Sequence, residues 1–138
     1  MVTKDKQKGF SLIELLLVVV IVALLATIAI PSLIRSRDAA EKISAISTLR
    51  MINLRQTGYF FRVGRYASLK ELNQSSDTPL GTVSGNSMNR GSYLYYQFPA
   101  WTMTSSSRYT VIAMKLSEGL IISALYIDQS GEVRTLIG

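Results

Sequence analysis

A single acidic residue, Glu14, lies at the start of the longest apolar stretch of this 138-residue chain. The segment from Leu15 to Ile34 carries no charge, and as a helix it would span about 30 Å, the thickness of a bilayer's hydrocarbon core. A carboxylate there costs about 2.5–3.5 kcal/mol and needs a partner. Position alone leaves two interpretations of Glu14. It either reaches the lipid headgroups or pairs with a positive group on another copy of the chain.

The composition excludes several kinds of reactive site. The chain has no cysteine and no histidine, which excludes disulfides, thiolate-ligated metals and hydrolase triads built on histidine. One acidic turn, from Asp128 to Glu132, offers a few oxygen atoms, whereas calcium takes about six to eight. We read this turn as a hairpin connection. We expect no enzyme activity, no cofactor and no metal site.

The residues around Glu14 form an ordered motif. A basic head, with lysines at positions 4, 6 and 8, precedes Gly9, Phe10, Ser11 and the apolar stretch. The run from Lys8 to Leu16 resembles the prepilin cleavage motif of type IV pilins and type II secretion pseudopilins. Pro31 matches the proline usually found in the same helix. The resemblance covers Lys4 to Arg37 and fades beyond.

The resemblance implies a sequence of processing and assembly steps. A prepilin peptidase would cut between Gly9 and Phe10, and the new amino group of Phe10 would be methylated. Glu14 would then pair with the Phe10 amine of a neighbouring copy during filament assembly. The implied domains are a leader over residues 1–9, a transmembrane and filament-core helix over 10–34, and a helix continuation with a globular head over 35–138.

Two features depart from the simplest form of this interpretation. Many type IV pilins close a C-terminal loop with a disulfide, which this chain cannot form, and the stretch from Val20 to Leu24 lacks the helix-breaking glycine of many relatives. An ordinary secretory signal remains an alternative, because Ala26, Ala29 and Ser32 provide small residues near the end of the apolar run. The dense basic block before the run favours a cytoplasmic N-terminus.

The apolar run continues as an amphipathic pattern. Spacings of three and four residues relate a stripe of apolar positions: Ala39, Ile43, Ile46, Leu49 and Ile52. We predict one long helix from about Ser11 to about Gln56, bent near Pro31, because proline removes a hydrogen bond inside a helix. Gly58 and Gly64 bracket its predicted end.

The rest of the chain reads as a short helical turn, a loop and a set of strands. Helical structure is expected within residues 66–72, and a Ser-, Thr- and Gly-rich loop over 74–92 that could contain an edge strand. The predicted strands are residues 93–98, 108–115, 121–127 and 133–137. The expected fold class is α+β: a long N-terminal helix packed on a small antiparallel sheet, which is also what the pilin resemblance implies.

A mixture of cations and aromatic rings follows the amphipathic stripe. It comprises Arg50, Arg55, Tyr59, Phe60, Phe61, Arg62, Arg65 and Tyr66. Such a mixture could stack bases and hold phosphates, but the favoured interpretation is a core edge with solvated arginines. These arginines could also contact acidic residues of another copy. The net charge of +6 is weak evidence for a nucleic-acid partner, which we consider possible but not favoured.

The leading functional hypothesis is a structural subunit of a type IV pilus-like filament. The precursor would reside in the bacterial inner membrane and the processed chain in an extracellular filament. Its partners would be other copies of itself, the prepilin peptidase, and the assembly platform with its ATPase motor. One alternative is a pseudopilin or minor pilin of a secretion or DNA-uptake system. Another, of a different class, is a membrane-anchored binding module that never assembles.

Overall fold

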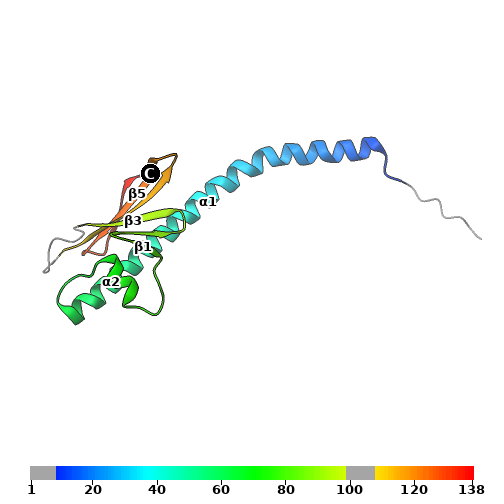
Figure 1. Ribbon diagram of the computed structural model, residues 1–138. Helices are drawn as coiled ribbons and strands as arrows, with labels where there is room; N and C mark the ends of the chain where they lie inside the picture. The colour runs from blue at the N-terminus through cyan, green and yellow to red at the C-terminus, as the bar shows by residue number, and fades with distance from the viewer. Residues whose placement is uncertain (1–8, 99–107) are drawn as a thin grey trace, which may run out of the picture. The chain divides into compact units, whose positions relative to one another are not determined.

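The computed structural model describes residues 9–98 and 108–138. The chain divides into two units, Met1–Ala39 and Ala40–Gly138. The elements in order are α1 (Leu12–Val63), α2 (Leu69–Gln74), β1 (Thr82–Ser84), β2 (Ser87–Arg90), β3 (Tyr93–Phe98), β4 (Thr110–Ser117), β5 (Leu120–Asp128) and β6 (Val133–Ile137) (Figure 1). The predicted α+β class is confirmed: a long N-terminal helix packs against an antiparallel sheet.

The first unit contains the apolar part of α1. From Leu12 to Ala39 every side chain is exposed except that of Ala26, which is half-buried. Pro31 lies inside the helix and has no N–H to donate to the carbonyl of Thr27. The hydroxyl of Thr27 donates to the carbonyl of Leu24 at 2.7 Å, and Ser36 makes the same kind of bond to Ser32 at 2.9 Å. The hydroxyls of Thr27 and Ser36 are thus satisfied by carbonyls of their own helix.

The second unit, which we call the head, is a six-stranded sheet with the later part of α1 on one face. The strands follow the order β1-β2-β3-β4-β5-β6, and each pairs antiparallel with the next, as in a simple meander. Alternate side chains point to the helix: Tyr93, Tyr95 and Gln97 of β3 are buried, while their neighbours are not. The core joins α1, α2 and the sheet through Leu49, Ile52, Leu69, Leu72, Met88, Val111, Leu125 and Ile127.

A buried polar clasp joins α1 to the chain that follows it. The Gln56 side chain donates to the carbonyl of Ala67 at 2.7 Å and accepts from the Ala67 N–H at 2.8 Å. Gln97 of β3 donates to the same carbonyl at 2.7 Å. The Tyr109 hydroxyl adds a hydrogen bond to the side-chain oxygen of Asn53. Buried polar groups require partners, so these bonds fix the position of α1 on the sheet.

Helix α2 is short and depends on its caps. Ser68 is the N-cap, its hydroxyl accepts from the Glu71 N–H, and Glu71 accepts from the Ser68 N–H at 2.8 Å, a complete capping box. Arg65 donates to both carboxylate oxygens of Glu71, at 3.1 and 2.6 Å. The Arg65 hydrogen bonds, and secondarily the Ser68 backbone, lower the pKa of Glu71 to about 2. One carboxylate thus joins the end of α1 to the start of α2.

The long helix ends later than predicted. It continues to Val63, so Gly58 lies inside it and only Gly64, with φ of +80°, marks its end. The predicted apolar stripe is also partly wrong, because Ile43 is 66% exposed and the buried side chains are Ala45, Thr48, Leu49, Ile52 and Gln56. The buried face thus contains two polar residues, which a search for apolar spacing does not find.

The predicted loop over residues 74–92 contains more structure than expected. Strands β1 and β2 form a hairpin within it, so the sheet has six strands instead of three or four. Close backbone approach explains Gly81, where a Cβ atom would lie 2.5 Å from the carbonyl oxygen of Asn89. Helix α2 begins at Leu69, inside the predicted turn, and ends two residues beyond it. The four predicted C-terminal strands match β3 to β6 closely. Residues 99–107, which separate the first two of these predicted strands, lie outside the described residues.

The buried clasp generates a stability prediction. We expect Gln56→Leu to lower the free energy of unfolding by about 2–3 kcal/mol, because the Ala67 N–H would remain buried without an acceptor. The measurement is chemical denaturation of the full chain in detergent. Gln129→Leu, at an exposed position in the β5–β6 turn, is the matched control. Equal stability of the two variants would contradict a structural role for the clasp.

The Arg65–Glu71 contact predicts a pH dependence. Because the folded-state pKa of Glu71 lies below its ordinary value of 4.5, its contribution to stability is present above pH 4.5 and is lost as the pH falls towards 2. We expect the melting temperature of Glu71→Gln to depend less on pH over this window than that of the unchanged chain. Glu118→Gln, which removes an exposed carboxylate, should leave the dependence unaltered. Parallel wild-type and Glu71→Gln curves would refute the assignment.

Candidate functional site

The predicted processing residues lie just before the first turn of α1. Gly9, Phe10 and Ser11 precede the helix and are exposed, and the Phe10 side chain is 83% exposed. No Cβ added at Gly9 would meet another atom within 4 Å. The chain at the Gly9–Phe10 bond is thus outside regular structure and uncovered by any described part of the chain. A peptidase needs such access to a backbone bond.

The Glu14 carboxylate closes the first turn of its own helix. Its Oε2 atom accepts from the Ser11 N–H at 2.9 Å, and the Leu15 N–H donates to the Ser11 carbonyl at 3.2 Å. A carboxylate in this place also interacts favourably with the helix dipole. The sequence contains the signal for this contact, since Ser11 and Glu14 have the serine–x–x–glutamate spacing of a capping box. Reasoning from membrane burial alone missed it.

The capping geometry places Glu14 close to the predicted new terminus. A cut between Gly9 and Phe10 would create an amine one residue before the Ser11 N–H that Glu14 already accepts. The carboxylate oxygens have room for more than one donor, since an ionised carboxylate offers about four lone-pair sites. Glu14 can therefore cap its own helix and accept a further cationic N–H group at the same time.

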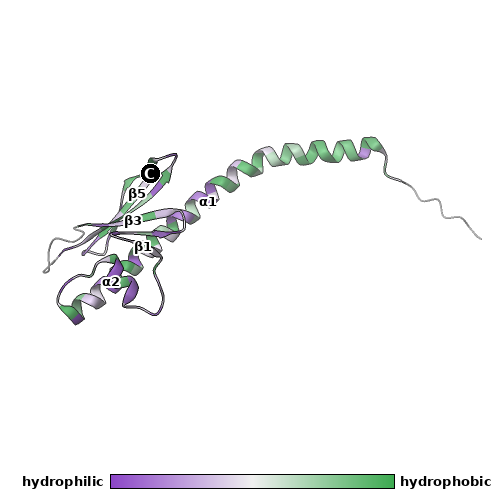
Figure 2. Ribbon diagram, in the orientation of Figure 1, coloured by the Kyte–Doolittle hydropathy of each residue, from purple (hydrophilic) through white to green (hydrophobic). Residues whose placement is uncertain are grey.

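The apolar segment that follows is uncovered on all sides. An 18-residue window of α1 has a mean hydropathy of 3.1, and none of it is buried within the chain. Figure 2 shows this part of the helix mainly in the hydrophobic colour, with a few paler turns. By length and composition it could cross a membrane. Pro31 lies near its end, and its role in bending the helix stays a prediction.

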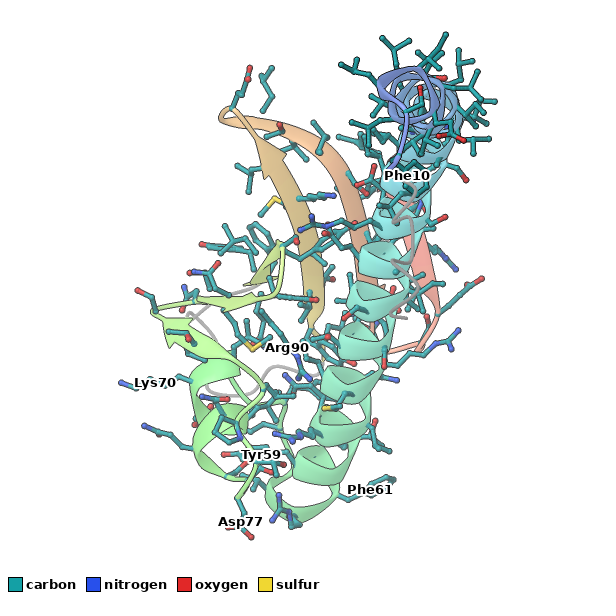
Figure 3. All side chains as sticks on the ribbon, turned by 90° about the vertical axis from the view of Figure 1, so that its right-hand side faces the viewer. Phe10, Tyr59, Phe61, Lys70, Asp77 and Arg90 are labelled. Carbon is teal, nitrogen blue, oxygen red and sulfur yellow. The ribbon has the colours of Figure 1, made fainter. Side chains whose placement is uncertain are left out.

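The residues of the predicted cationic and aromatic cluster at the end of α1 lie in different environments. Phe60 and Tyr66 pack with ring centroids 4.8 Å apart, and Tyr66 packs on Tyr109 at 4.7 Å. Arg65 is occupied by Glu71 and lies 5.5 Å from the centre of the Tyr59 ring. Phe61, in contrast, is 82% exposed and points away from the head (Figure 3). Most of the rings therefore belong to a core edge, and a nucleic-acid partner stays an untested possibility.

The acidic turn is a hairpin connection, as predicted. Between β5 and β6 the Gly131 N–H donates to the Asp128 carbonyl at 3.0 Å, with Gly131 at φ +79°. The Ser130 N–H donates to the Asp128 carboxylate at 2.8 Å. Hydrogen bonding to the Ser130 side chain, and secondarily to its backbone N–H, lowers the pKa of the Asp128 carboxyl. Within the described residues no group of three or more acidic side chains gathers as a metal site.

Comparison with known proteins concerns mainly the N-terminal segment. The family described as "Prokaryotic N-terminal methylation motif" matches residues 4–30. The type II secretion system core protein G of Escherichia coli is 40% identical over 45 residues, 33% of this chain and 31% of that protein. The type IV major pilin protein PilA of Myxococcus xanthus is 36% identical over 62 residues, 45% of this chain and 28% of that protein.

These matches decide the nature of the segment. The chain carries the N-terminal segment of the type IV pilin and type II secretion pseudopilin family. The resemblance predicted from the sequence is confirmed. A longer alignment, with the type II secretion system core protein G of Aeromonas hydrophila, is 26% identical over 92 residues, 66% of this chain and 64% of that protein.

The similarity stops short of the whole relatives. The matched region spans about a third of the length of the first two relatives, and no solved structure matches the chain. The pilin-type segment is thus well supported, whereas the head is known from its own structure. The roles of Gly9, Phe10, Glu14 and Pro31 in processing and assembly remain predictions.

Proposed function

We propose that the chain is a structural subunit of a type IV pilus-like filament, assembled through α1 after prepilin peptidase cleavage. The observation that carries the proposal is the uncovered apolar segment of α1 directly behind the methylation motif. A helix that is apolar all round must be covered by lipid or by other apolar helices. In the precursor the inner membrane would cover it, and in the filament the same segment of other copies would do so.

The proposal assigns a place and partners to each part of the chain. Residues 1–9 are the leader, 10–34 the transmembrane and filament-core helix, and 35–138 the helix continuation and head. The precursor stays in the inner membrane until an assembly platform and its ATPase motor move it into an extracellular filament. The chain itself is structural and performs no catalysis. The peptidase and the motor supply the chemistry.

A pseudopilin of a type II secretion system is a second candidate with specific support. The alignments with core protein G of Aeromonas hydrophila, Dickeya chrysanthemi and Pectobacterium carotovorum reach further along those relatives than the alignment with PilA does. Both candidates share processing at Gly9 and packing of α1. The two candidates predict different effects of deleting the gene: loss of a pseudopilin would impair secretion, whereas loss of a major pilin would remove surface fibres.

The N-terminal peptide of the protein in sheared fibres tests the proposal. We expect abundant peptide that starts at methylated Phe10, because cleavage and methylation precede assembly. Mass spectrometry of sheared and membrane fractions measures it. The same peptide confined to the membrane fraction, or at trace level in fibres, would favour the pseudopilin or minor pilin. A peptide that still begins before Gly9 would contradict both the filament subunit and the pseudopilin or minor pilin, and would leave the anchored binding module.

Glu14 variants separate capping from pairing between copies. Glu14→Gln can still accept the Ser11 N–H but has no charge to pair with the Phe10 amine, while Glu14→Ala loses both. If the charge pairs with that amine, both variants should reduce the assembled fraction by about tenfold or more, because one partner of a buried pair is lost. Quantitative blotting of sheared fibres measures this.

The controls for Glu14 are built into the chain. Glu132→Gln removes an exposed carboxylate from the β5–β6 turn and should leave assembly unchanged. Normal assembly of Glu14→Gln together with loss in Glu14→Ala would show that capping alone matters. Normal assembly of both variants would show that assembly depends on neither the charge nor the capping bond of Glu14, and would contradict its proposed role.

A further inference from the structure

A basic pocket lies at the end of the head where α1 and α2 finish. It is a hollow of about 400 Å³ lined by Arg55, Gly58 and Arg62 of α1 and by Ser75 and Ser76, which follow α2. Two guanidinium groups and two hydroxyls are suitable for binding a carboxylate. No described acidic side chain forms an ion pair with either arginine, and Asp77, beside the pocket in sequence, is exposed (Figure 3).

Arg55 has an unfilled hydrogen-bonding position. Its Nη2 atom donates to the Thr78 hydroxyl at 3.0 Å, while Nη1 is shielded from solvent and has no hydrogen-bond partner. A buried charged donor without an acceptor is unfavourable, and such groups in native structures call for a missing partner. The Arg62 side chain uses only one of its donors, to the Gly58 carbonyl at 3.3 Å. The Arg62 side chain, which is exposed, therefore has donors available for an anion that enters the pocket.

The opposite end of the head presents a carboxylate without a partner. Glu118 is exposed at the tip of the β4–β5 hairpin, and no described residue bonds to it. It is also the one described non-glycine residue with a positive φ, +52°. Ser117 pairs with Leu120, so Glu118 and Gly119 form a two-residue hairpin turn, and the positive φ of both residues is what such a turn requires. Four apolar side chains near Glu118 are also exposed: Leu116, Leu120, Ile121 and Ile122.

The two features lie far apart on one head. Lys115 of β4 forms an ion pair with Glu41 of α1 at 2.7 Å, which places the start of the hairpin tip beside Glu41. Arg55 and Arg62 lie about 21 and 32 Å further along α1, at 1.5 Å per residue. Figure 1 shows the hairpin, in orange, and α2 at opposite ends of the sheet. Glu118 therefore cannot reach the pocket of its own chain.

We propose that Glu118 of one copy binds in the Arg55–Arg62 pocket of the next copy. This contact rests on the proposed filament function and names one of its interfaces. The apolar residues around Glu118 would meet Leu54 and Phe61, which are exposed one position before each arginine on α1. A contact between two different surfaces can be repeated from each copy to the next. It generates an open helical filament unless the rotation between copies closes a ring. Neighbours in this contact are offset by about 20–30 Å along α1.

Cysteine crosslinking tests the contact directly, because the chain has no cysteine of its own. Ser117 lies beside Glu118, and Ser76 lines the pocket. We expect Ser117→Cys combined with Ser76→Cys to form disulfide-linked ladders in sheared fibres after mild oxidation. The matched control combines Ser117→Cys with Ser47→Cys, an exposed position elsewhere on α1. Ladders no stronger than those of the control pair would overturn the proposal.

Charge exchange tests the electrostatic part of the contact. Glu118→Arg should lower the crosslinked fraction by about tenfold, the loss expected for one charge-assisted pair, and adding Arg62→Glu should restore it. Adding Arg50→Glu, at an exposed arginine outside the pocket, should not restore it. Equal recovery of the crosslinked fraction with either arginine variant would show that only the net charge of the chain matters. That result would overturn the specific pairing of Glu118 with Arg62.

Glu118→Asn separates docking from folding. Asparagine tolerates a positive φ better than glutamate does, so we expect the melting temperature of the head to rise while the crosslinked fraction falls. If both quantities fall, Glu118 acts through folding and the docking proposal is wrong. Fibres that contain methylated Phe10 but lack the Ser117–Ser76 ladder would overturn this contact and leave the proposed function standing. Wild-type cells without fibres would overturn both.

Discussion

An apolar helix that its own chain does not cover is the constraint on which this protein depends. The segment from Leu15 to Ile34 exposes large aliphatic side chains on every side, and no described residue packs over them. At about 25 cal/mol per Å² of apolar surface, leaving such a helix in water is strongly unfavourable. Lipid or the same helix of other copies must therefore cover it. The chain cannot be stable in water as an isolated monomer with this segment exposed.

In the second unit, the later part of the same helix is packed into a folded head. After Ala40 the helix keeps one buried face, and that face includes Gln56 beside Leu49 and Ile52. Apolar contact alone allows a helix to slide along a sheet, whereas the Gln56–Ala67 bonds are satisfied in one position only. The polar clasp therefore sets the register between α1 and the sheet.

The charged groups of the chain divide into those satisfied internally and those left for a partner. Glu71, Glu41 and Glu132 have cationic partners within the head. Glu14 accepts a backbone N–H of its own helix and keeps further lone pairs for a cation. In the described head, Glu118 and the Arg55–Arg62 pocket are among the charged groups without an opposite charge, and they lie at two different ends. An asymmetric distribution of this kind suits a subunit that adds repeatedly in one direction.

The sequence by itself determined the features that depend on order along the chain. The motif around Gly9 and Glu14, the apolar helix and strands β3 to β6 follow from local spacing and alternation, which do not require tertiary contacts. The capping of α1 was also readable in Ser11 and Glu14. Only the tertiary structure decided the continuation of α1 to Val63, the β1–β2 hairpin and the burial of Gln56, because each depends on partners distant in sequence. The same holds for the pocket of Arg55 and Arg62. The local sequence shows two arginines seven residues apart, but only folding brings Ser75 and Ser76 beside them and keeps Glu118 of the same chain away.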